Sequence, residues 1–507
     1  MFKNHPKGLL GAALANMGER FGFYVMMAIL LLFLNNKFGF SGSEGAIIYS
    51  IFYALIYVLA LVGGLIADRT KNYKGTIMIG LILMTIGYVL IAIPTETPVQ
   101  NFPLILGYTC FGLFAIAFGN GLFKGNLQAV VGQLYDNPQY ADKRETGFQI
   151  FYMFINVGAM FAPIMAVGLR NWWVQHNGFK FNADLPALCN QFLNGTITTD
   201  AQARLSELAV QVGSATSDLT VFAKQYLNVF MEGYHYSFGI AIFAMLISLT
   251  IFLINRAKLP DPAAKSLDVK QNAQEVEMDA KEIRQRMYAL FAVFGVVIFF
   301  WFSFHQNGQT LTLFANDYTR MININLGFTT LQGAEVFQAF NPIFVVTLTP
   351  IIIGLFGWMR NKGWEVSTPK KIAIGMGIAA LAFGIMTIGS IGLPDAATRK
   401  AMGGLDEAMR VSPLLLIVTY LVLTVAELFI SPLGIAFVSK VAPPKYQGVM
   451  QGGWLSATAL GNQLLFIGVI FYNSIPVWAT WMIFVVACLI SMTIMLSMLK
   501  WLEKVAK

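Results

Sequence analysis

The stretch "NRAKLPDPAAKSLDVKQNAQEVEMDAKEIRQRM", residues 255–287, is a charged segment in an otherwise apolar chain. It carries prolines near its start and helix-favouring residues after Ala273. On both sides of it the chain repeats apolar runs of about 20 residues, the length that crosses a bilayer. The segment therefore predicts a linker outside the membrane that divides the chain into two halves.

The composition of the whole chain points the same way. Its 507 residues are 56% hydrophobic and only 12% charged, and the mean hydropathy is +0.63. Soluble domains contain about 25% charged residues, so this chain is expected to fold within a lipid bilayer. The net charge of +8 is expected to reflect membrane topology and the anionic lipid surface, and not a nucleic-acid partner.

Twelve apolar runs are expected to span the membrane as helices, six on each side of the linker. They lie near residues 9–34, 46–67, 74–94, 103–131, 147–168, 234–254, 288–315, 335–358, 370–393, 412–438, 447–472 and 476–499. This all-α arrangement of two six-helix bundles resembles the major facilitator superfamily fold, in which substrate binds at mid-membrane between the bundles. The expected domains are a first bundle at 1–254, the linker at 255–287 and a second bundle at 288–507.

Lysine and arginine residues predict the orientation of these helices. If both termini are cytoplasmic, the inside segments hold 23 of the 34 basic residues and the outside segments hold nine. Residues 170–233 then form a long outside insertion, in which 200–230 has the apolar spacing of a helix that lies on the membrane or caps the bundle. The expected location is the plasma membrane, here the inner membrane of a bacterium.

Two charges stand side by side in the first span, within "NMGERFGFY", residues 16–24. A charge at membrane depth costs about 2.5–3.5 kcal/mol on insertion scales, so it usually serves a function. Helical spacing predicts one stripe that faces a cavity, made of Asn16, Glu19 or Arg20, and Phe23 or Tyr24. Adjacent residues point about 100° apart, so Glu19 and Arg20 are not expected to pair well with each other. The alternative is an ion pair that only locks helices together.

The other buried charges fall in opposite halves of the chain. Lys124, in "GNGLFKGN", lies near the middle of the fourth span, and Glu427, in "TVAELFISPLG", lies in the tenth. With Arg20 they predict a positive pole in one half and a negative pole in the other, which suits a zwitterionic substrate. The remaining expected cavity residues are polar or aromatic: Tyr24, Tyr57, Asn156, Asn341, Trp301 and Trp454. For each aromatic residue taken alone, packing between helices is the alternative.

Five stretches in order resemble motifs of one transporter family. They are "NMGERFGFY", "YVLALVGGLIADR" (57–69), "FYMFINVGAM" (151–160), "FQAFNPIF" (337–344) and "ELFISPLG" (427–434). On these motifs the chain resembles the proton-coupled oligopeptide transporters of the major facilitator superfamily, over nearly its whole length. The resemblance implies a secondary transporter that imports di- and tripeptides with protons by alternating access and needs no cofactor or metal.

The resemblance also implies roles for individual residues. The implied substrate-binding residues are Arg20 and Lys124 for the peptide carboxylate, Glu427, Asn156 and Asn341 for the amino terminus, and Tyr24, Tyr57, Trp301 and Trp454 as further cavity lining.

Departures from the family motifs concern proton coupling. Asn16 stands where the first-helix signature has its first glutamate, and His305, in "FWFSFHQNG", stands where the family commonly has an acid. Two carboxylates are thus missing, which predicts intact binding but altered coupling. Glu19 remains as a switch or pairing residue, and His305, with an unperturbed pKa of about 6.5, is a candidate proton carrier. The alternative for His305 is a neutral, hydrogen-bonded helix residue.

The sequence also bears on functions other than peptide transport. A membrane enzyme is not expected, because the sequence has no H-x-x-x-H motif, G-x-S-x-G motif or Cys/His cluster. A peptide facilitator without coupling and a drug exporter of the same fold both stay open as alternatives. The two charged poles suit peptides better than lipophilic cations.

Overall fold

The computed structural model describes residues 5–40, 43–70, 72–135, 137–140, 144–214, 216–260, 280–364, 366–443 and 447–506. Within these ranges, twelve helical segments are long and apolar enough to cross a membrane. The prediction of an all-α protein with twelve spans is therefore confirmed. Most of the expected linker falls on residues 261–279, outside the described residues. So do several lysines on which the predicted orientation depends, namely Lys3, Lys71, Lys143, Lys265, Lys270, Lys445 and Lys507.

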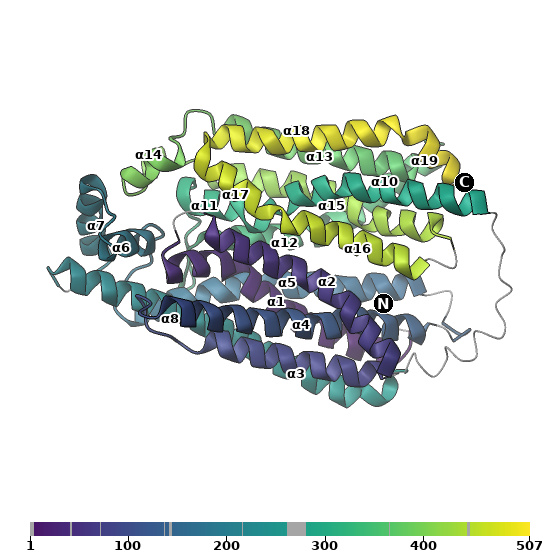
Figure 1. Cartoon of the computed structure of the whole chain (residues 1–507), viewed down its shortest axis with the longest axis horizontal. Coiled ribbons are helices and arrows are strands. Elements are labelled where there is room, and N and C mark those ends of the chain that lie inside the picture. The colour runs from purple at the N-terminus through teal and green to yellow at the C-terminus, as the bar shows by residue number, and fades with distance from the viewer. Residues whose placement is uncertain are drawn as a thin grey trace.

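The first six spans form one packed group of helices (Figure 1). They are α1 (Gly8–Phe38), α2 (Glu44–Thr70), α3 (Tyr73–Ala92), α4 (Phe102–Leu134), α5 (Arg144–His176) and α8 (Leu219–Asn255, followed by the short turn η2, Arg256–Lys258). Helix α1 packs mainly on α5 and α8, while α4 packs on α2 and α3.

The last six spans pack mainly on one another, and three of them are interrupted helices. They are α10 (Ala280–Phe304) with η4 (His305–Gly308) and α11 (Thr310–Tyr318), η5 (Ala334–Ala339) with α12 (Phe340–Asn361), α13 (Thr368–Gly389), α15 (Pro413–Val441), α16 (Gln447–Gln463) with α17 (Leu465–Ser474), and α18 (Val477–Ser497). The two groups meet mainly where α2 contacts α16 and α17 and where α5 contacts η5 and α12.

Two glycines set the position of α4, the helix that carries Lys124. A Cβ atom on Gly119 of α4 would lie 2.6 Å from the carbonyl oxygen of Gly80 on α3. Likewise, a Cβ atom on Gly80 would lie 2.6 Å from the carbonyl oxygen of Gly119. No larger residue fits at such a distance, so both positions require glycine. This close contact fixes α4 against the bundle, and Lys124 lies just over one turn beyond it.

The outside insertion 170–233 does not form a single helix over 200–230. Helix α7 (Thr199–Gln211) ends before Gly213, which has a φ of +96°, and α8 starts anew at Leu219, where the side chain of Asp218 accepts hydrogen bonds from the first turn. The prediction of the sixth span from residue 234 was therefore too short. Hydropathy alone missed this part of α8, because polar side chains such as Lys224 interrupt the apolar run.

The insertion covers one end of the helix bundle. Helix α6 (Leu185–Leu193) and α7 lie at this end beside the short helix α14 (Ala396–Ala401), whereas both chain termini lie at the other end (Figure 1). We call these the capped end and the terminal end. The remaining short elements are η6 (Glu407–Met409), α19 (Leu499–Val505) and an antiparallel pair of strands, β1 (Ile324–Asn325) and β2 (Thr330–Leu331).

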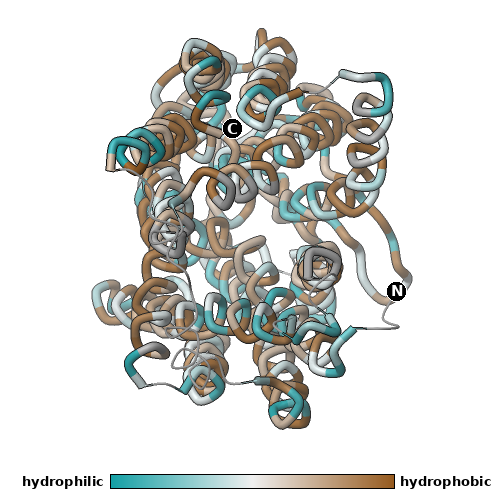
Figure 2. Tube along the Cα trace, turned by 90° about the vertical axis from the view of Figure 1, so that its right-hand side faces the viewer, coloured by the Kyte–Doolittle hydropathy of each residue, from teal (hydrophilic) through white to brown (hydrophobic). Residues whose placement is uncertain are grey.

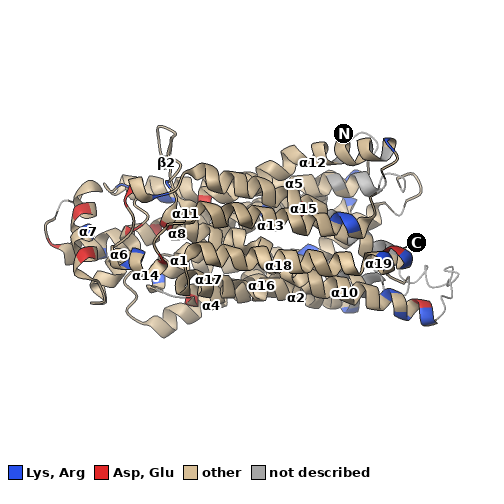
Figure 3. Ribbon diagram, turned by 90° about the horizontal axis from the view of Figure 1, so that it is seen from above, with Lys and Arg blue, Asp and Glu red and all other residues tan. Residues whose placement is uncertain are grey.

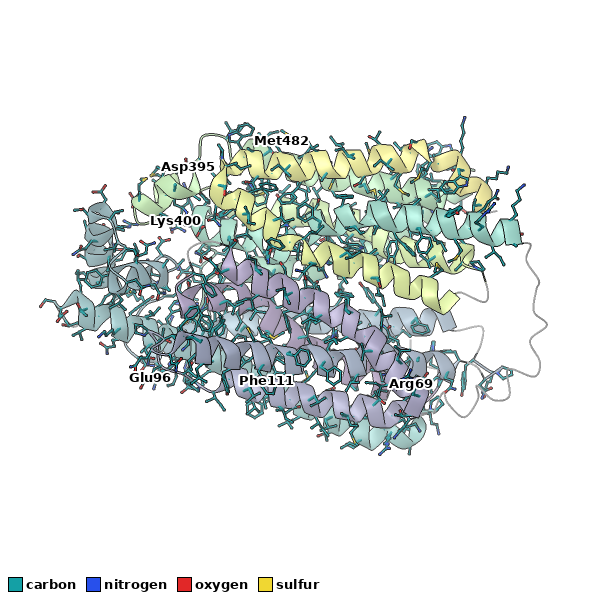
Figure 4. The ribbon with its side chains drawn as sticks, viewed as in Figure 1. Arg69, Glu96, Phe111, Asp395, Lys400 and Met482 are labelled. Carbon is teal, nitrogen blue, oxygen red and sulfur yellow. The ribbon has the colours of Figure 1, made fainter. Side chains whose placement is uncertain are left out.

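The surface of the bundle fits a membrane protein. Acidic and basic residues gather toward the two ends, and the long middle of the bundle carries few of them (Figure 3). Viewed from the terminal end, the helices are coloured mostly as hydrophobic (Figure 2). Among the labelled side chains, Phe111 and Met482 lie on opposite outer sides, Arg69 lies toward the terminal end, and Asp395 and Lys400 lie toward the capped end (Figure 4).

Buried polar contacts join the two halves at the capped end. Arg170 on α5 forms an ion pair with Glu335 on η5, and the hydroxyl of Tyr234 donates to the same carboxylate at 3.2 Å. Next to this pair, Asn171 donates to the backbone carbonyls of Thr330 and Gln332 at 2.8 and 2.7 Å. Because both charged side chains are almost fully buried, separating the halves here would strand two charges.

The insertion adds a second set of contacts between the halves at the same end. Asp184, just before α6, pairs with Arg410 at 2.7 Å, and the hydroxyl of Thr198 donates to the carbonyl of Ala401 at 2.8 Å. Arg204 on α7 pairs with Asp406 at 2.8 Å, but this pair is much more exposed. Of the two possibilities for the insertion, capping the bundle is the one observed.

Candidate functional site

A cavity of about 590 Å³ lies between the two halves and takes side chains from both. Eleven of the thirteen residues singled out in the sequence line it: Arg20, Phe23, Tyr24, Tyr57, Lys124 and Asn156 from the first half, and Trp301, His305, Asn341, Glu427 and Trp454 from the second. The other two, Asn16 and Glu19, are buried but do not line it. The predicted stripe on α1 thus reaches the cavity only through Arg20, Phe23 and Tyr24.

Glu19 and Arg20 form a bidentate ion pair, contrary to the sequence prediction. Arg20 Nε lies 2.5 Å from Glu19 Oε2, and Arg20 Nη2 lies 2.6 Å from Glu19 Oε1. Helical spacing determines only the directions of the two Cα–Cβ bonds, which point about 100° apart. The arginine side chain is long enough to bend back to its neighbour, and two charges buried together gain by pairing.

Neighbouring amides complete the surroundings of this pair. Asn120 on α4 donates from Nδ2 to Glu19 Oε1 at 2.6 Å, so both oxygens of the carboxylate are occupied. The Nδ2 atom of Asn16 is buried and makes no hydrogen bond to the described residues. The guanidinium of Arg20 also lies over the ring of Phe23, 4.5 Å from its centroid. Glu19 is therefore held in place by the protein itself.

Lys124 presents an amine to the cavity without an acidic partner among the described residues. Its Nζ lies 4.4 Å from the centroid of the Tyr57 ring, a cation–π contact. A solitary ammonium at membrane depth is costly, and an aromatic face offsets only part of that cost. The structure thus leaves the positive charge of Lys124 available to a ligand.

Glu427 lies in the other half and shares a hydrogen-bond network with Asn341. Asn341 Nδ2 lies 2.9 Å from Glu427 Oε2 and 3.0 Å from the hydroxyl of Thr424. Asn156, on α5, donates to the backbone carbonyl of Tyr152 at 3.2 Å. Because Asn341 binds one carboxylate oxygen, the direction of the Glu427 side chain is fixed while the other oxygen stays open for a donor.

His305 lies at the break between α10 and η4. Its ring stacks on Trp301 with centroids 4.9 Å apart and lies 5.1 Å from the ring of Tyr53 on α2. Its Nδ1 atom is 2.5 Å from Oδ1 of Asn462 on α16. His305 is thus a hydrogen-bonded residue that also lines the cavity, so the structure combines features of both interpretations of this residue.

Sequence reasoning missed several residues around the site. Asn120 and Asn462 hold Glu19 and His305, while Tyr53 and Tyr152 line the cavity. A signal was present for the two asparagines, because each is an amide in the middle of an apolar span, the same signal that drew attention to Asn156. Which charged or titratable group each asparagine would contact depended on the packing of distant helices.

Comparison with models of protein families shows which family the chain belongs to. The model of the POT family matches residues 74–262 and 263–480, which is most of the chain. The chain belongs to the POT family. The resemblance to proton-coupled oligopeptide transporters drawn from the sequence motifs is therefore confirmed. Members of the POT family are transporters and not enzymes, so this chain is a multi-pass membrane transporter.

Curated relatives cover nearly the full length of this POT-family chain. The peptide transporter YePEPT of Yersinia enterocolitica subsp. palearctica is 29% identical over 482 residues, which cover 91% of this chain and 87% of that protein. Dipeptide and tripeptide permease B of Xenorhabdus bovienii is 28% identical over 475 residues, with 91% and 86% covered. An uncharacterized transporter of Bacillus subtilis, YclF, is 28% identical over 478 residues, with 91% and 87% covered.

Solved structures of POT transporters share the fold. The peptide transporter POT in complex with sulfate aligns over 100% of this chain and 96% of its own, with a TM-score of 0.71 and 22% identity. A POT family transporter in complex with 5-aminolevulinic acid gives a TM-score of 0.71 at 21% identity, with 100% and 98% covered. The expected major facilitator fold is thereby confirmed.

Proposed function

We propose that this POT-family transporter imports di- and tripeptides and binds them as zwitterions between Lys124 and Glu427. The main observation behind the proposal is that one cavity is lined by the amine of Lys124 from the first half and by the carboxylate of Glu427 from the second. Its volume of about 590 Å³ lies within the range of about 300–1,000 Å³ typical of small-molecule sites. Relatives named as peptide transporters and as dipeptide and tripeptide permeases agree with this substrate class.

Lys124 is the principal anchor of the peptide carboxylate in this proposal. Arg20 donates from Nε and Nη2 to Glu19, which leaves Nη1 as the guanidinium nitrogen that makes no hydrogen bond to the described residues. Among the described residues, no carboxylate competes for Lys124 in this way. A substrate carboxylate would therefore pair with the full charge of Lys124 and add a single hydrogen bond from Arg20. The side chains of Tyr24 and Tyr57 line the same region.

Glu427 is the anchor of the amino terminus. Asn341 orients its carboxylate, and the amide oxygen of Asn156, from the facing helix, adds an acceptor for an ammonium group. The aromatic rings of Trp301 and Trp454 then provide apolar surface for the peptide side chains. Uptake of a peptide with both termini free would compensate both charges of the cavity at once.

Alternating access would occur by relative movement of two bundles, residues 1–254 and 288–507, linked by 255–287. We infer that the capped end faces the outside of the cell and that both termini are cytoplasmic, in the inner membrane of a bacterium. In the present conformation, buried ion pairs join the two halves at that end. They would have to separate before a peptide could enter from outside.

Proton coupling would depend on His305. Glu19 is held by Arg20 and Asn120, and Asn16 cannot titrate, whereas His305 lines the cavity and keeps one ring nitrogen open. The alternative is an uncoupled peptide facilitator. A drug exporter of the same fold is the third possibility. A cavity with one positive and one negative pole suits a zwitterionic peptide better than a lipophilic cation, so it does not favour this function.

Uptake into proteoliposomes separates these functions. Purified protein is reconstituted, and accumulation of a labelled dipeptide is measured with an imposed pH gradient (inside alkaline), with a membrane potential, and with neither. Accumulation above equilibrium that needs the pH gradient supports proton-coupled import. Equilibration without accumulation under every gradient supports the facilitator. Displacement of a lipophilic cation, but no dipeptide uptake, would support the drug exporter and contradict our proposal.

A further inference from the structure

Two helix breaks meet beside the cavity. The seventh span is interrupted after Phe304, where α10 gives way to η4, and the eleventh is interrupted at Leu464, between α16 and α17. Side chains join the two breaks directly. Gln306 donates from Nε2 to the backbone carbonyl of Leu465 at 3.2 Å, and His305 contacts Asn462 at 2.5 Å.

The imidazole of His305 is held on three sides. Trp301 stacks on one face with an interplanar angle of 20°, the ring of Tyr53 lies 5.1 Å away at 52°, and Asn462 binds Nδ1. The remaining atom, Nε2, makes no hydrogen bond to the described residues, and it is not among their fully buried unpaired polar atoms. Nε2 is therefore the atom through which His305 faces the cavity.

The partner at Nδ1 decides which ring nitrogen carries the proton. The amide oxygen of Asn462 can only accept, so it requires a proton on Nδ1. Neutral His305 then has its lone pair on Nε2. When the ring gains a proton at Nε2, the Nδ1–H donor to Asn462 is retained, so the contact survives in both protonation states.

We propose that Asn462 is a positioning residue that fixes His305 as the Nδ1–H tautomer, so that protons enter and leave the ring only at Nε2, on the cavity side. This goes beyond the role given to His305 above and rests on that proposed role. The titratable groups that face His305 are Tyr53 from α2 and, across the cavity, Lys124 from α4. Among the described residues, no carboxylate is hydrogen-bonded to the ring.

Nitrogen NMR of the imidazole tests the assignment without any transport measurement. Protein labelled with 15N-histidine is compared with His305→Gln, which identifies the signals of His305. The wild type should show Nδ1 protonated and Nε2 bare when the ring is neutral. Asn462→Asp keeps an acceptor and should keep this tautomer, whereas Asn462→Leu removes it and should give a mixture. A bare Nδ1 in the wild type, or the same spectrum in Asn462→Leu, overturns the proposal.

Transport by the same variants tests the consequence. Partners that orient metal-ligating histidines contribute about 10- to 100-fold to their function, and on the same physical ground Asn462→Leu should lower the maximal rate of proton-driven uptake by at least about 10-fold. The KM for dipeptide and the rate of counterflow exchange should change little, and Asn462→Asp should restore the rate. Ser456→Ala, on the same helix but outside the cavity lining, is the control and should behave as wild type.

The two measurements separate the two claims. If proton-driven uptake survives His305→Gln, the proposed coupling role of His305 is wrong, while the spectra still decide the tautomer. If uptake depends on His305 but Asn462→Leu transports with an unchanged maximal rate and pH profile, then Asn462 is not a positioning residue.

Discussion

Arg20 Nε lies 2.5 Å from Glu19 Oε2, although the two residues are neighbours on one helix and only Arg20 lines the cavity. The pair joins the cavity to the interior of the first half, where Asn120 donates to the same carboxylate. Asn16, one turn earlier on the same helix, carries no charge, so among the described residues Glu19 is the carboxylate that pairs with Arg20.

The first prediction concerns this ion pair. Glu19→Gln leaves Arg20 charged and buried, and breaking a buried pair from one side typically costs about 3–5 kcal/mol. The apparent melting temperature of the purified protein should fall clearly. The double variant Glu19→Gln/Arg20→Gln removes both charges and should recover most of the loss. If the double variant melted at a lower temperature than Glu19→Gln, the ion pair would stabilise the fold by more than the neutralisation of one buried charge by the other.

The second prediction concerns the two poles of the cavity. Lys124→Ala and Glu427→Gln each remove one charge-assisted contact to a zwitterion, worth about 1.5–3 kcal/mol, so dipeptide affinity should fall by about 10- to 100-fold. Both variants should stay monodisperse, because Lys124 has no acidic partner among the described residues and glutamine keeps the hydrogen bond of Glu427 to Asn341. The measurement is dipeptide-induced thermal stabilisation. Lys224→Ala, an exposed lysine on α8, is the matched control. Aggregation of both site variants would instead indicate structural roles.

The third prediction concerns His305. A pH gradient, inside alkaline, should drive dipeptide accumulation above equilibrium in the wild type, because the histidine gains a proton on the acidic side and loses it on the alkaline side. His305→Gln should abolish accumulation but spare counterflow exchange, which needs no net proton movement. Strong accumulation by His305→Gln would return the coupling role to Glu19.

The fourth prediction concerns the buried ion pair at the capped end. Glu335→Gln leaves Arg170 buried without its partner, which destabilises the closed arrangement and should raise the population open at this end by at least about 10-fold. Spin labels at Val221→Cys on α8 and Ile391→Cys beyond α13, with the exposed Cys110 replaced by serine, report the separation of the halves.

Asp406→Asn is the control for this fourth prediction. Its ion pair with Arg204 also joins the halves, but the Asp406 side chain is 67% exposed, and exposed pairs contribute about 0–1 kcal/mol. The distance distribution should therefore stay close to that of the wild type. Equal effects of Glu335→Gln and Asp406→Asn would show that burial of the pair does not govern closure.

The fold was predictable from the sequence because membrane crossing is a local property. An apolar run of about 20 residues must be helical to satisfy its backbone within a membrane, and each of the twelve runs coincides with a helical segment long and apolar enough to cross one. The start of α8 at Leu219 escaped this rule, since the helix begins beyond the apolar segment, where Asp218 caps it and Lys224 is exposed to solvent. Hydropathy locates a membrane core but not the full length of a helix.

The site was predictable where it depends on isolated charges. Lys124 and Glu427 stand alone in apolar spans. Because burying an isolated charge in a membrane is costly, they were expected to face a common cavity, and both residues line it. The ion pair of Glu19 and Arg20 was only the less favoured alternative in the sequence prediction, because it depends on side-chain rotamers, which helical spacing does not determine. The contact of His305 with Asn462 was not predictable, since it requires two helix breaks, far apart in the sequence, to meet in space.

The central claim is that each terminus of the peptide is held by an opposite pole of the cavity. A competition assay tests this most directly. It measures how well a free dipeptide, its N-acetylated form and its C-amidated form inhibit uptake of a labelled dipeptide by the wild type, Lys124→Ala and Glu427→Gln. In the wild type both blocked forms should compete at least about 10-fold more weakly than the free dipeptide. Lys124→Ala should lose the discrimination against C-amidation alone, and Glu427→Gln should lose the discrimination against N-acetylation alone. Blocked and free dipeptides that compete equally well in the wild type would contradict the account.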